Sequence, residues 1–261
     1  MDKFKGPKIL CIDLETTPLE VYSWGIYDQQ INPQQIIKDW SILSWAACWL
    51  HEPNKMMYMD TRKEKDPRND KNILKEIHKL MNEADIVLGQ NSNSFDIKRL
   101  NTRFMVHNMK PPSSYRKIDT KRIAKKYFAF TTSSLDFMTK TLNTRQEKMK
   151  NSGLSLWIGC LNKNLKSFKE LEKYNKQDVA ATVSLYLDHL QPWDSSLNPS
   201  LYTDTLDHIC SCGCKKLNRN GFAYTSTGKY QRFSCSRCGA EVRAKDNLLS
   251  KEKRKSLLTK V

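Results

Sequence analysis

Short apolar runs alternate with longer amphipathic segments over roughly the first three quarters of the chain. Short runs of apolar and aromatic residues are typical of buried strands, whereas apolar side chains three or four positions apart are typical of helices. We therefore predict strands at Lys8–Ile12, Val21–Tyr27, Ser41–Leu50 and Asp85–Gly89, and a short strand that ends at Ile118.

Helical spacing recurs between and after these runs. Ser167 and Glu170 have the spacing of a capping box and predict the start of a long helix that ends before Pro192. Thr61–Lys71 is expected to be a charged loop, and positions 143–166 are expected to be irregular. The remaining helices are predicted at Asn72–Asn82, Phe95–Met105, Ile123–Tyr127 after a cap at Asp119, and Thr132–Leu142. Strands that alternate with helices predict an α/β layer fold.

Composition and charge narrow the class of protein. The longest apolar stretch, Ile42–Leu50, is far shorter than the roughly 20 residues that span a membrane. Asp13 and Glu15 interrupt the first apolar run, so no secretory signal is predicted and we expect a cytoplasmic protein. Lys and Arg number 44 against 28 Asp and Glu, a net charge of +16, which favours a phosphate backbone as partner over plain solubility or an anionic membrane surface.

Four carboxylates and one tyrosine are the candidate catalytic residues. Asp13 and Glu15 alternate on a predicted strand and so share one of its faces. Asp96 follows a predicted strand and turn, and Tyr174 and Asp178 lie one helical turn apart. Taken singly, each has an ordinary explanation as a surface acid, a helix cap or a core aromatic. Gathered together, they would repel one another and need cations between them.

These segments resemble the three motifs of the DEDD superfamily of 3′→5′ exonucleases, which has a ribonuclease-H-like fold. The motifs match as Asp13-Leu14-Glu15, Asn91-x-x-x-Phe95-Asp96 and Tyr174-x-x-x-Asp178. The resemblance covers roughly residues 7 to 190 in the right order and spacing. It implies a mixed sheet flanked by helices.

The residue that precedes the last Asp separates two branches of that superfamily. The histidine branch would need His at position 173, which is Lys173 here, and Tyr174 matches the tyrosine branch. That branch is similar to the proofreading domains of DNA polymerases and to ribonuclease D. A compact chain with a trailing zinc ribbon is most similar to stand-alone phage exonucleases, and a phage-encoded protein would act in the host cytoplasm.

The resemblance implies a metal-dependent mechanism and a set of roles. Two Mg²⁺ or Mn²⁺ ions, roughly 4 Å apart, would be held by Asp13, Glu15, Asp96 and Asp178. Tyr174 would orient the attacking water and not act as a base, since its usual pKa is near 10. Two further residues are candidate substrate contacts: Asn91 would contact the terminal nucleotide or hold its own turn, and Phe95 would be a stacking wedge or a core side chain.

Five of the eight cysteines crowd into a short C-terminal segment that carries no disulfide signature. Cys235-x-x-Cys238-Gly is a good half of a zinc site, and the sequence around it resembles the zinc ribbons of phage nucleases and transposases. We predict one Zn²⁺ on Cys210, Cys212, Cys235 and Cys238, with Cys214 as an alternate ligand. His208 is expected to lie at the surface. A reduced, redox-active cluster is the alternative.

The expected organisation is an exonuclease domain at 1–192, a linker at 193–204, a zinc ribbon at 205–246 and a flexible basic tail at 247–261. From Thr205 onward 13 Lys and Arg face 4 Asp and Glu, and Tyr224, Tyr230 and Phe233 lie among them. Cations interleaved with aromatic residues suit contact with a nucleic acid strand, although a small ribbon also needs aromatic residues for its core. The ribbon is therefore expected to assist DNA binding.

The function predicted from the sequence is a 3′→5′ exonuclease that shortens single-stranded DNA ends and releases nucleoside 5′-monophosphates. The same chemistry on RNA is the first alternative, and duplex DNA is a further substrate to consider. A nucleic-acid-binding module without catalysis is the second alternative, and a redox or metal-storage protein is the third. Partners from replication or recombination would fit such an enzyme, and no membrane partner is expected.

Overall fold

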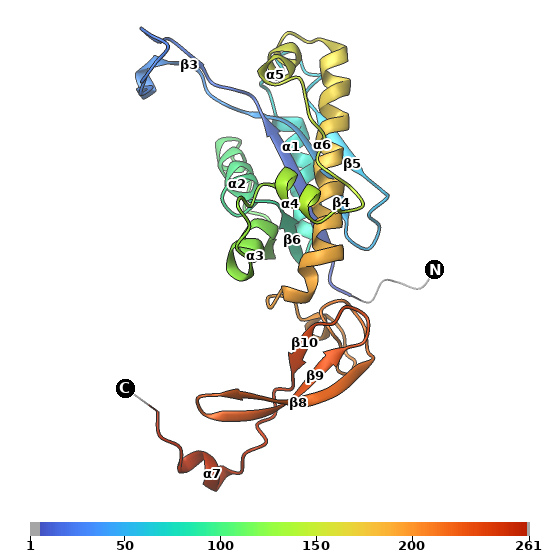
Figure 1. Ribbon diagram of the computed structural model, residues 1–261. Coiled ribbons are helices and arrows are strands. Elements are labelled where there is room, and N and C mark those ends of the chain that lie inside the picture. Colours follow the sequence, from blue (N-terminus) through green and yellow to red (C-terminus); the bar gives the residue numbers. More distant parts are fainter. Residues whose placement is uncertain (1–5, 260–261) are drawn as a thin grey trace. The chain divides into compact units, whose positions relative to one another are not determined.

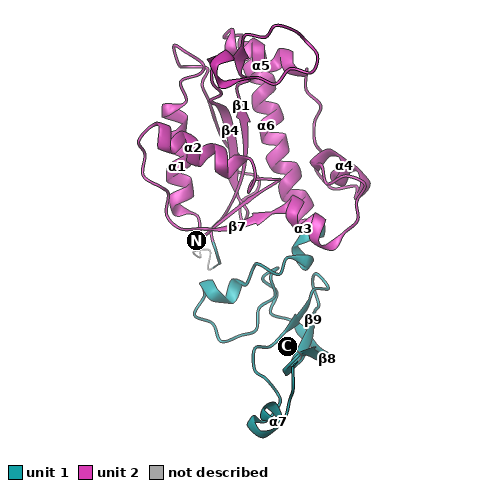
Figure 2. Cartoon of the chain, turned by 90° about the vertical axis from the view of Figure 1, so that its left-hand side faces the viewer, with its two compact units in different colours: residues 1–7, 189–261 teal, residues 8–188 magenta. Residues whose placement is uncertain are grey.

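The computed structural model describes residues 6–259 (Figure 1). The chain forms two compact units, one from Lys8 to Asp188 and one that comprises the residues from His189 onward (Figure 2). Each unit is described separately below. Within residues 6–259, no helix combines the length and the apolar character that crossing a bilayer would require.

The first unit is built on a mixed five-stranded sheet in the order β5-β4-β1-β6-β7. The central strand β1 (Ile9–Thr16) pairs antiparallel with β4 (Ile42–Trp49) and parallel with β6 (Ile86–Gly89). The edges are β5 (Met57–Asp60), antiparallel to β4, and β7 (Arg116–Asp119), parallel to β6. Helices cover the sheet on both faces (Figures 1 and 2), so the predicted α/β fold is confirmed.

Two hydrophobic clusters show which helices lie over each face of the sheet and therefore which side chains of β1 face them. On one face Leu10, Ile12 and Leu14 of β1 pack with buried side chains of α1 (Lys71–Glu83) and α2 (Asp96–Val106). On the other face Leu43 of β4 packs with α5 (Leu154–Leu161) and α6 (Leu165–Leu185). Because side chains alternate along a strand, Cys11, Asp13 and Glu15 face away from α1 and α2. Two further helices follow β7: α3 (Thr120–Tyr127) and α4 (Leu135–Thr141).

The predicted strand at Val21–Tyr27 is wrong. Only β2 (Glu20–Val21) is a strand there, and it pairs with β3 (Ile36–Lys38) at the root of an extended arm. The short helical turn η1 (Pro33–Gln35) precedes β3. The aromatic residues that suggested a strand are exposed, because no sheet neighbour or core lies beside them in the part of the chain that the structure describes.

The structure corrects two predictions about the segment before the third motif. Positions 143–166 are not irregular throughout, since α5 occupies Leu154–Leu161. Its sequence is apolar almost all round, so it shows little helical periodicity. Helix α6 starts at Leu165, near the predicted Ser167, but its cap is Asn164, whose side chain accepts hydrogen bonds from the backbone N–H groups of Lys166 and Ser167. Strand β5 was not predicted either.

The second unit contains a three-stranded sheet in the order β10-β9-β8. Strands β8 (Leu217–Thr225) and β9 (Gly228–Cys235) form an antiparallel hairpin, and β10 (Glu241–Arg243) pairs with β9. A helical turn, η4 (Pro199–Tyr202), precedes the sheet. The basic tail contains a short helix, α7 (Lys251–Lys255), whose Ser250 cap accepts a hydrogen bond from the Lys253 N–H.

Candidate functional site

Three of the predicted carboxylates meet in the first unit. Asp13 and Glu15 project from the same face of β1, and Asp178 comes from α6, which packs against that face. One oxygen from each carboxylate lies within 4.8 Å of the others. Strand β1 and helix α6 are far apart in the sequence, but α6 packs on the sheet and so brings Asp178 next to Asp13 and Glu15.

Asp96 lies beside this group and is anchored to β1. Its Oδ1 accepts a hydrogen bond of 3.0 Å from the backbone N–H of Leu14, between Asp13 and Glu15. Strand β6 pairs with β1 only as far as Cys11, so this N–H has no strand partner on that side and Asp96 satisfies it. Asp96 is not one of the three carboxylates whose oxygens converge.

The turn before Asp96 is tightly specified. A side chain at Gly89 would bring Cβ within 2.7 Å of the Ser92 Cβ, so the chain needs glycine where β6 ends. Asn91 has a left-handed φ of 60°, and its backbone N–H donates to the Asp119 carboxylate. The same carboxylate caps α3, as predicted. The Asn91 backbone therefore holds its turn, and the half-buried Phe95 ring lies under the guanidinium of Arg99 at 5.1 Å.

Lys148 joins the site from the loop before α5. Its Nζ donates to Asp178 Oδ2 at 2.6 Å and lies 5.0 Å from the centre of the Tyr174 ring. Burial disfavours the ammonium ion, but the Asp178 carboxylate outweighs that effect and raises the pKa of Lys148. Burial and the charge of Asp178 also raise the pKa of Tyr174, so its hydroxyl stays protonated at neutral pH.

Two donors orient the carboxylates of β1. Asn175 Nδ2 donates to Asp13 Oδ2 at 2.6 Å, and the amide is itself oriented by Ser44, whose hydroxyl donates to Asn175 Oδ1 at 2.9 Å. Trp157 of α5 donates through its indole Nε1 to Glu15 Oε2 at 3.2 Å. Such donors fix the rotamers of ligand side chains.

The electrostatic balance of the site opposes full ionisation. Burial raises the pKa of Asp13 well above its usual value, and the charges of Asp96, Glu15 and Asp178 add to the rise. Burial and Asp178 raise the pKa of Glu15 to about 8, against the opposing effect of Lys148. Burial raises the pKa of Asp96 to about 7, and burial also raises that of Asp178. Converging carboxylates of this kind invite a bound cation.

The residues present fit a hard divalent cation. Asp178 Oδ1 is buried and has no hydrogen-bond partner among residues 6–259, which is rare for a carboxylate oxygen in a protein interior. All the ligand atoms would be carboxylate oxygens, the type that Mg²⁺ and Mn²⁺ prefer. Asp13, Glu15 and Asp178 would hold such an ion, with Asp96 next to them.

The second unit contains a cluster of four cysteines. Cys210, Cys212, Cys235 and Cys238 place their sulfur atoms within 4.8 Å of one another. The Cys210–Cys238 and Cys212–Cys235 Sγ distances are 3.6 and 3.7 Å, near the roughly 3.8 Å that Zn–S bonds of 2.3 Å give in a tetrahedron.

Each half of the cluster is a tight backbone turn closed by a glycine. Gly213 and Gly239 follow the second cysteine of each half and have left-handed φ values of 80° and 72°. The Gly213 N–H donates to Cys210 O, and the Gly239 N–H donates to Cys235 O. Although burial opposes ionisation, backbone N–H donors lower the pKa of Cys235 to about 6. A thiolate is the form that binds zinc.

The remaining candidates lie outside this cluster. Cys214 is buried beside it, with Sγ 3.7 Å from Lys216 O and 3.8 Å from Ser236 Oγ. The His208 ring packs on Phe233, with 5.4 Å between ring centres. The four converging sulfurs therefore offer a complete tetrahedral set without either residue.

Sequence reasoning missed the groups that surround the carboxylates. Asn175 carried a weak signal, because a buried amide next to Tyr174 is unusual on the packed side of a helix. Lys148 carried none, because basic residues are common throughout this chain. Trp157 was hidden by the helix that was not predicted.

The comparisons with known proteins agree with this architecture. A model of the RNase H superfamily matches residues 38–190, a range that includes Asp96 and Asp178 and begins after β1. No curated protein matches the chain. One similar solved structure is the family B DNA polymerase from the hyperthermophilic archaeon Pyrobaculum calidifontis, with a TM-score of 0.51 and 13% identity. The likeness covers 87% of this chain and 32% of the polymerase chain, so this chain spans about a third of that protein.

A likeness at this level of identity shows the fold alone. The family match is different in kind, since it covers more than half of the sequence and the sheet order and helix layers are those just described. The chain belongs to the RNase H superfamily.

Proposed function

We propose that this chain is a metal-dependent 3′→5′ exonuclease that removes nucleoside 5′-monophosphates from single-stranded DNA ends. The observation that carries the proposal is the convergence of oxygens of Asp13, Glu15 and Asp178 within 4.8 Å, with one buried Asp178 oxygen unpaired within the described part of the chain. Membership of the RNase H superfamily and the polymerase-like fold support a nuclease. The net charge of +16 supports a polyanionic substrate.

The protein groups would divide the work of hydrolysis. Water attacks the terminal phosphorus, the bond from phosphorus to the 3′ oxygen breaks, and the shortened strand keeps a 3′ hydroxyl. Divalent cations, when bound, would supply Lewis-acid activation for this displacement. Tyr174 stays protonated and would orient the attacking water by a hydrogen bond. Lys148 would hold a positive charge beside Asp178, where the phosphate charge must be accommodated.

The ribbon would assist by binding the nucleic acid strand. Lys229 Nζ lies 4.0 Å from the centre of the Phe222 ring, and the Arg243 guanidinium lies 4.0 Å from that of Tyr230. Tyr224 is exposed on the same hairpin. Cations next to exposed aromatic rings provide phosphate contact and base stacking together. One Zn²⁺ on the four converging cysteines would hold this surface in shape.

The test offers end-labelled strands to the purified full-length chain loaded with zinc. Single-stranded DNA, duplex DNA and RNA, each labelled at the 3′ or the 5′ end, are incubated without divalent cation and after addition of Mg²⁺ or Mn²⁺. We expect release of mononucleotides from the 3′ label on single-stranded DNA, only when the cation is added.

The outcomes separate the alternatives. Faster shortening of RNA would make the enzyme an exoribonuclease. If the chain bound a strand but cleaved none with either Mg²⁺ or Mn²⁺, the result would favour a nucleic-acid-binding module without catalysis. An Asp178→Asn variant serves as the control, because contaminating nuclease would survive that change.

A further inference from the structure

An extended arm rises from the end of β1 and is set apart from the rest of the first unit. It comprises residues 20–38, with β2 and β3 at its root and η1 on its returning leg. Figure 1 shows this arm, marked by β3, extending away from the sheet. The arm starts five residues after Glu15, so it grows directly out of the strand that carries two of the catalytic carboxylates.

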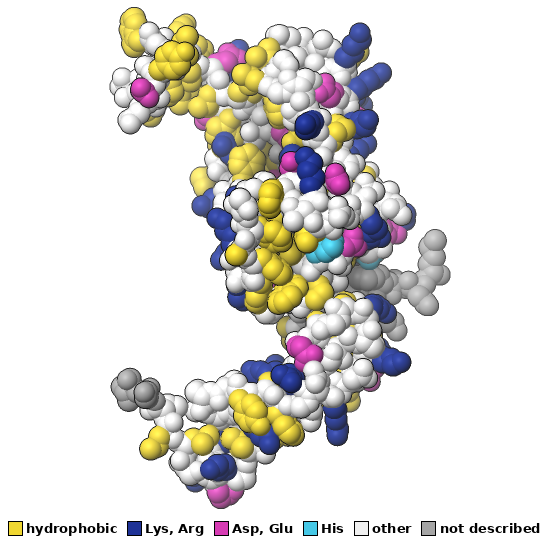
Figure 3. Space-filling view, viewed as in Figure 1, with side chains coloured by type: hydrophobic (Ala, Val, Ile, Leu, Met, Phe, Trp, Pro, Cys, Tyr) yellow, Lys and Arg dark blue, Asp and Glu magenta, His cyan; other side chains and the backbone are white. Residues whose placement is uncertain are grey.

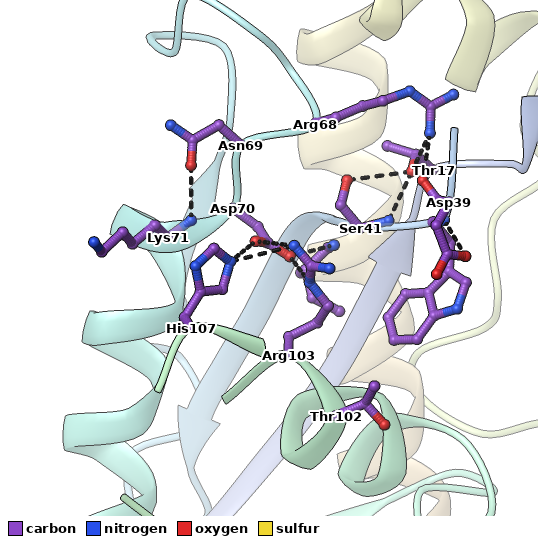
Figure 4. Close-up of polar contacts among 12 residues, drawn as sticks. Thr17, Asp39, Ser41, Arg68, Asn69, Asp70, Lys71, Thr102, Arg103 and His107 are labelled. Carbon is purple, nitrogen blue, oxygen red and sulfur yellow. Dashed lines mark hydrogen bonds and ion pairs between the residues drawn. The ribbon is translucent and has the colours of Figure 1, made fainter. Parts of the chain in front are cut away.

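The root of the arm is held firmly on both legs by one arginine (Figure 4). Arg68 Nη1 donates to Thr17 Oγ1, Pro18 O and Asp39 O, each at 3.0 Å, and Nη2 donates to Glu20 at 2.8 Å. Thr17 and Ser41 hydrogen-bond across the two legs.

A second anchor lies two positions further along the same loop. Asp70 is fully buried and accepts from the backbone N–H of Ile42 at 2.9 Å, and also from Arg103 and His107 of the α2 end (Figure 4). The returning leg is therefore fixed to α2 as well as to the loop. A root with this many polar contacts indicates a built element and not a loose loop.

Polar groups of the two legs of the arm bond to one another. Tyr22 and Gln35 exchange hydrogen bonds across the arm, since the Tyr22 N–H donates to Gln35 O and Gln35 Nε2 donates to Tyr22 O. Asn32 and Gln35 form a capping box on η1. The large apolar side chains are turned outward: Trp24 is 100% exposed, Ile26 89%, Tyr27 83% and Tyr22 73%.

The charge of the arm is unlike that of the rest of the chain. Between Val21 and Ile37 the sequence has no Lys or Arg, and Asp28 is its one charged residue, in a chain with a net charge of +16. Figure 3 shows hydrophobic side chains and no cations at the end of the arm. Such a surface is unsuited to phosphates or to anionic lipid, but it suits the uncharged faces of nucleobases.

A line of stacked groups connects the arm with the carboxylates. Phe95, next to Asp96, lies 5.1 Å from the Arg99 guanidinium, and Arg99 lies 4.0 Å from the centre of the Trp40 ring at the root of the arm. Arg99 thus supplies, next to the root of the arm, the positive charge that the arm itself lacks. A strand whose 3′ end sits at the carboxylates could place a phosphate near Arg99 and its bases on the arm.

From this arrangement we propose that the arm binds unpaired bases of the substrate strand behind its 3′ end, with Trp24, Tyr22 and Tyr27 as stacking platforms. The proposal rests on the proposed exonuclease function. Trp24 follows Glu15 by nine residues, which places it at most about 30 Å away along the chain. Stacked bases are about 3.4 Å apart, so the contacted bases lie within about nine nucleotides of the end.

A substrate-length comparison tests the proposal. The kcat/KM values of the wild type, Trp24→Ala and Trp24→Phe are measured on two substrates. One is a single strand of about 15 nucleotides, longer than the distance from the carboxylates to Trp24, and the other is a dinucleotide. We expect Trp24→Ala to lower the ratio of kcat/KM on the long strand to kcat/KM on the dinucleotide by about five- to 150-fold, the range for loss of one stacked base. Trp24→Phe should restore most of this ratio. Met105→Ala, an exposed apolar change on α2, is the matched control.

A binding measurement keeps the test independent of catalysis. In an Asp178→Asn background, 2-aminopurine is placed at successive positions from the 3′ end, and its fluorescence quenching is recorded with and without Trp24→Ala. Quenching at a few internal positions that disappears with Trp24→Ala supports the arm as a base-binding element. This result would stand even if the wild-type chain cleaved no strand, in which case the proposed function alone would fail.

Two results would overturn the proposal. One is an equal ratio of kcat/KM values in Trp24→Ala and in the wild type, with unchanged quenching. The other is a concentration-dependent dimer in sedimentation that Trp24→Ala dissociates, since the arm would then be covered by a second copy of this chain and not by bases.

Discussion

The carboxylate site and the cysteine cluster both gather metal-ligand side chains, but different forces hold the two groups together. Around Asp13 and Asp178, one large and one smaller hydrophobic cluster form the surrounding layers, and neither contains a carboxylate of the site. In the second unit, the buried cluster consists of Cys210, Cys214, Cys235 and Ala240, packed against Cys212, Cys238 and Leu217. In the first unit the fold creates the site, whereas in the ribbon the ligands are themselves most of the core.

This difference has an electrostatic counterpart. The gathered carboxylates repel one another and cost folding free energy, which the hydrophobic layers must offset. The cysteines gain folding free energy from a bound ion, because a small sheet of three short strands buries little apolar surface. Removing ligands should therefore have different effects on stability in the two units.

The largest expected effect is on the ribbon. Cys235→Ser, or removal of zinc, should unfold the unit from His189 onward and leave residues 8–188 folded, because structural zinc supplies roughly 10–16 kcal/mol in small zinc domains. Hydrogen exchange resolved along the chain measures both units at once. The matched control is Cys214→Ser, which changes a buried cysteine that is not one of the four converging ligands and should keep one bound zinc. Equal zinc loss in both variants would contradict the assigned ligand set.

Next in size is the effect of one carboxylate on cleavage. Asp178→Asn should abolish cleavage and change the free energy of unfolding little, because relief of the repulsion among the carboxylates offsets loss of the ion pair with Lys148. Cleavage of labelled single-stranded DNA and chemical denaturation provide the two measurements. Glu83→Gln, which changes an exposed carboxylate paired with Lys8, is the control and should retain cleavage. A large loss of stability in Asp178→Asn would remove the contrast between the two units.

The stability of the first unit should fall as the pH rises when divalent cations are absent. The pKa of Glu15 is raised to about 8 and that of Asp96 to about 7, so without divalent cations their stabilising contribution is complete below about pH 4 and is lost as the pH rises through 7 to 8.

Thermal unfolding of the zinc-loaded chain from pH 5 to pH 8 checks this dependence. The transition of residues 8–188 should move to lower temperature as the pH rises, and Mg²⁺ or Mn²⁺ should restore it most at pH 8. Glu15→Gln should make the decrease in unfolding temperature smaller near pH 8, because it removes the carboxyl group whose pKa is about 8. A transition that instead rises with pH in the absence of divalent cations would show that the carboxylates do not repel one another as the structure implies.

The smallest effect concerns a residue that orients a ligand. Trp157→Phe keeps the ring but removes the N–H that donates to Glu15, and it should weaken Mn²⁺ binding by about ten- to a hundred-fold with little change in stability. Titration calorimetry measures the affinity. Trp45→Phe is the control, because its indole donates to Ile73 O away from the site. Comparable weakening in both variants would mean that general packing, and not the Glu15 contact, was lost.

Local pattern alone determined several features of this protein. The alternation of Asp13 and Glu15 on β1, the one-turn spacing of Tyr174 and Asp178, and the glycine after each cysteine pair are all encoded within a few residues. The physical reason is that strand and helix periods fix which neighbours share a face, whatever the rest of the chain does.

Only the tertiary structure decided which of these faces meet and what surrounds them. Trp157 reaches Glu15 across a separation of 142 residues, and Asn175 reaches Asp13 across 162. The aromatic run after β1 became an exposed arm instead of a strand, because Arg68 and Asp70 hold its legs and no sheet edge receives it. Such contacts depend on how whole layers pack, and side-chain periodicity within one element carries no information about its partners.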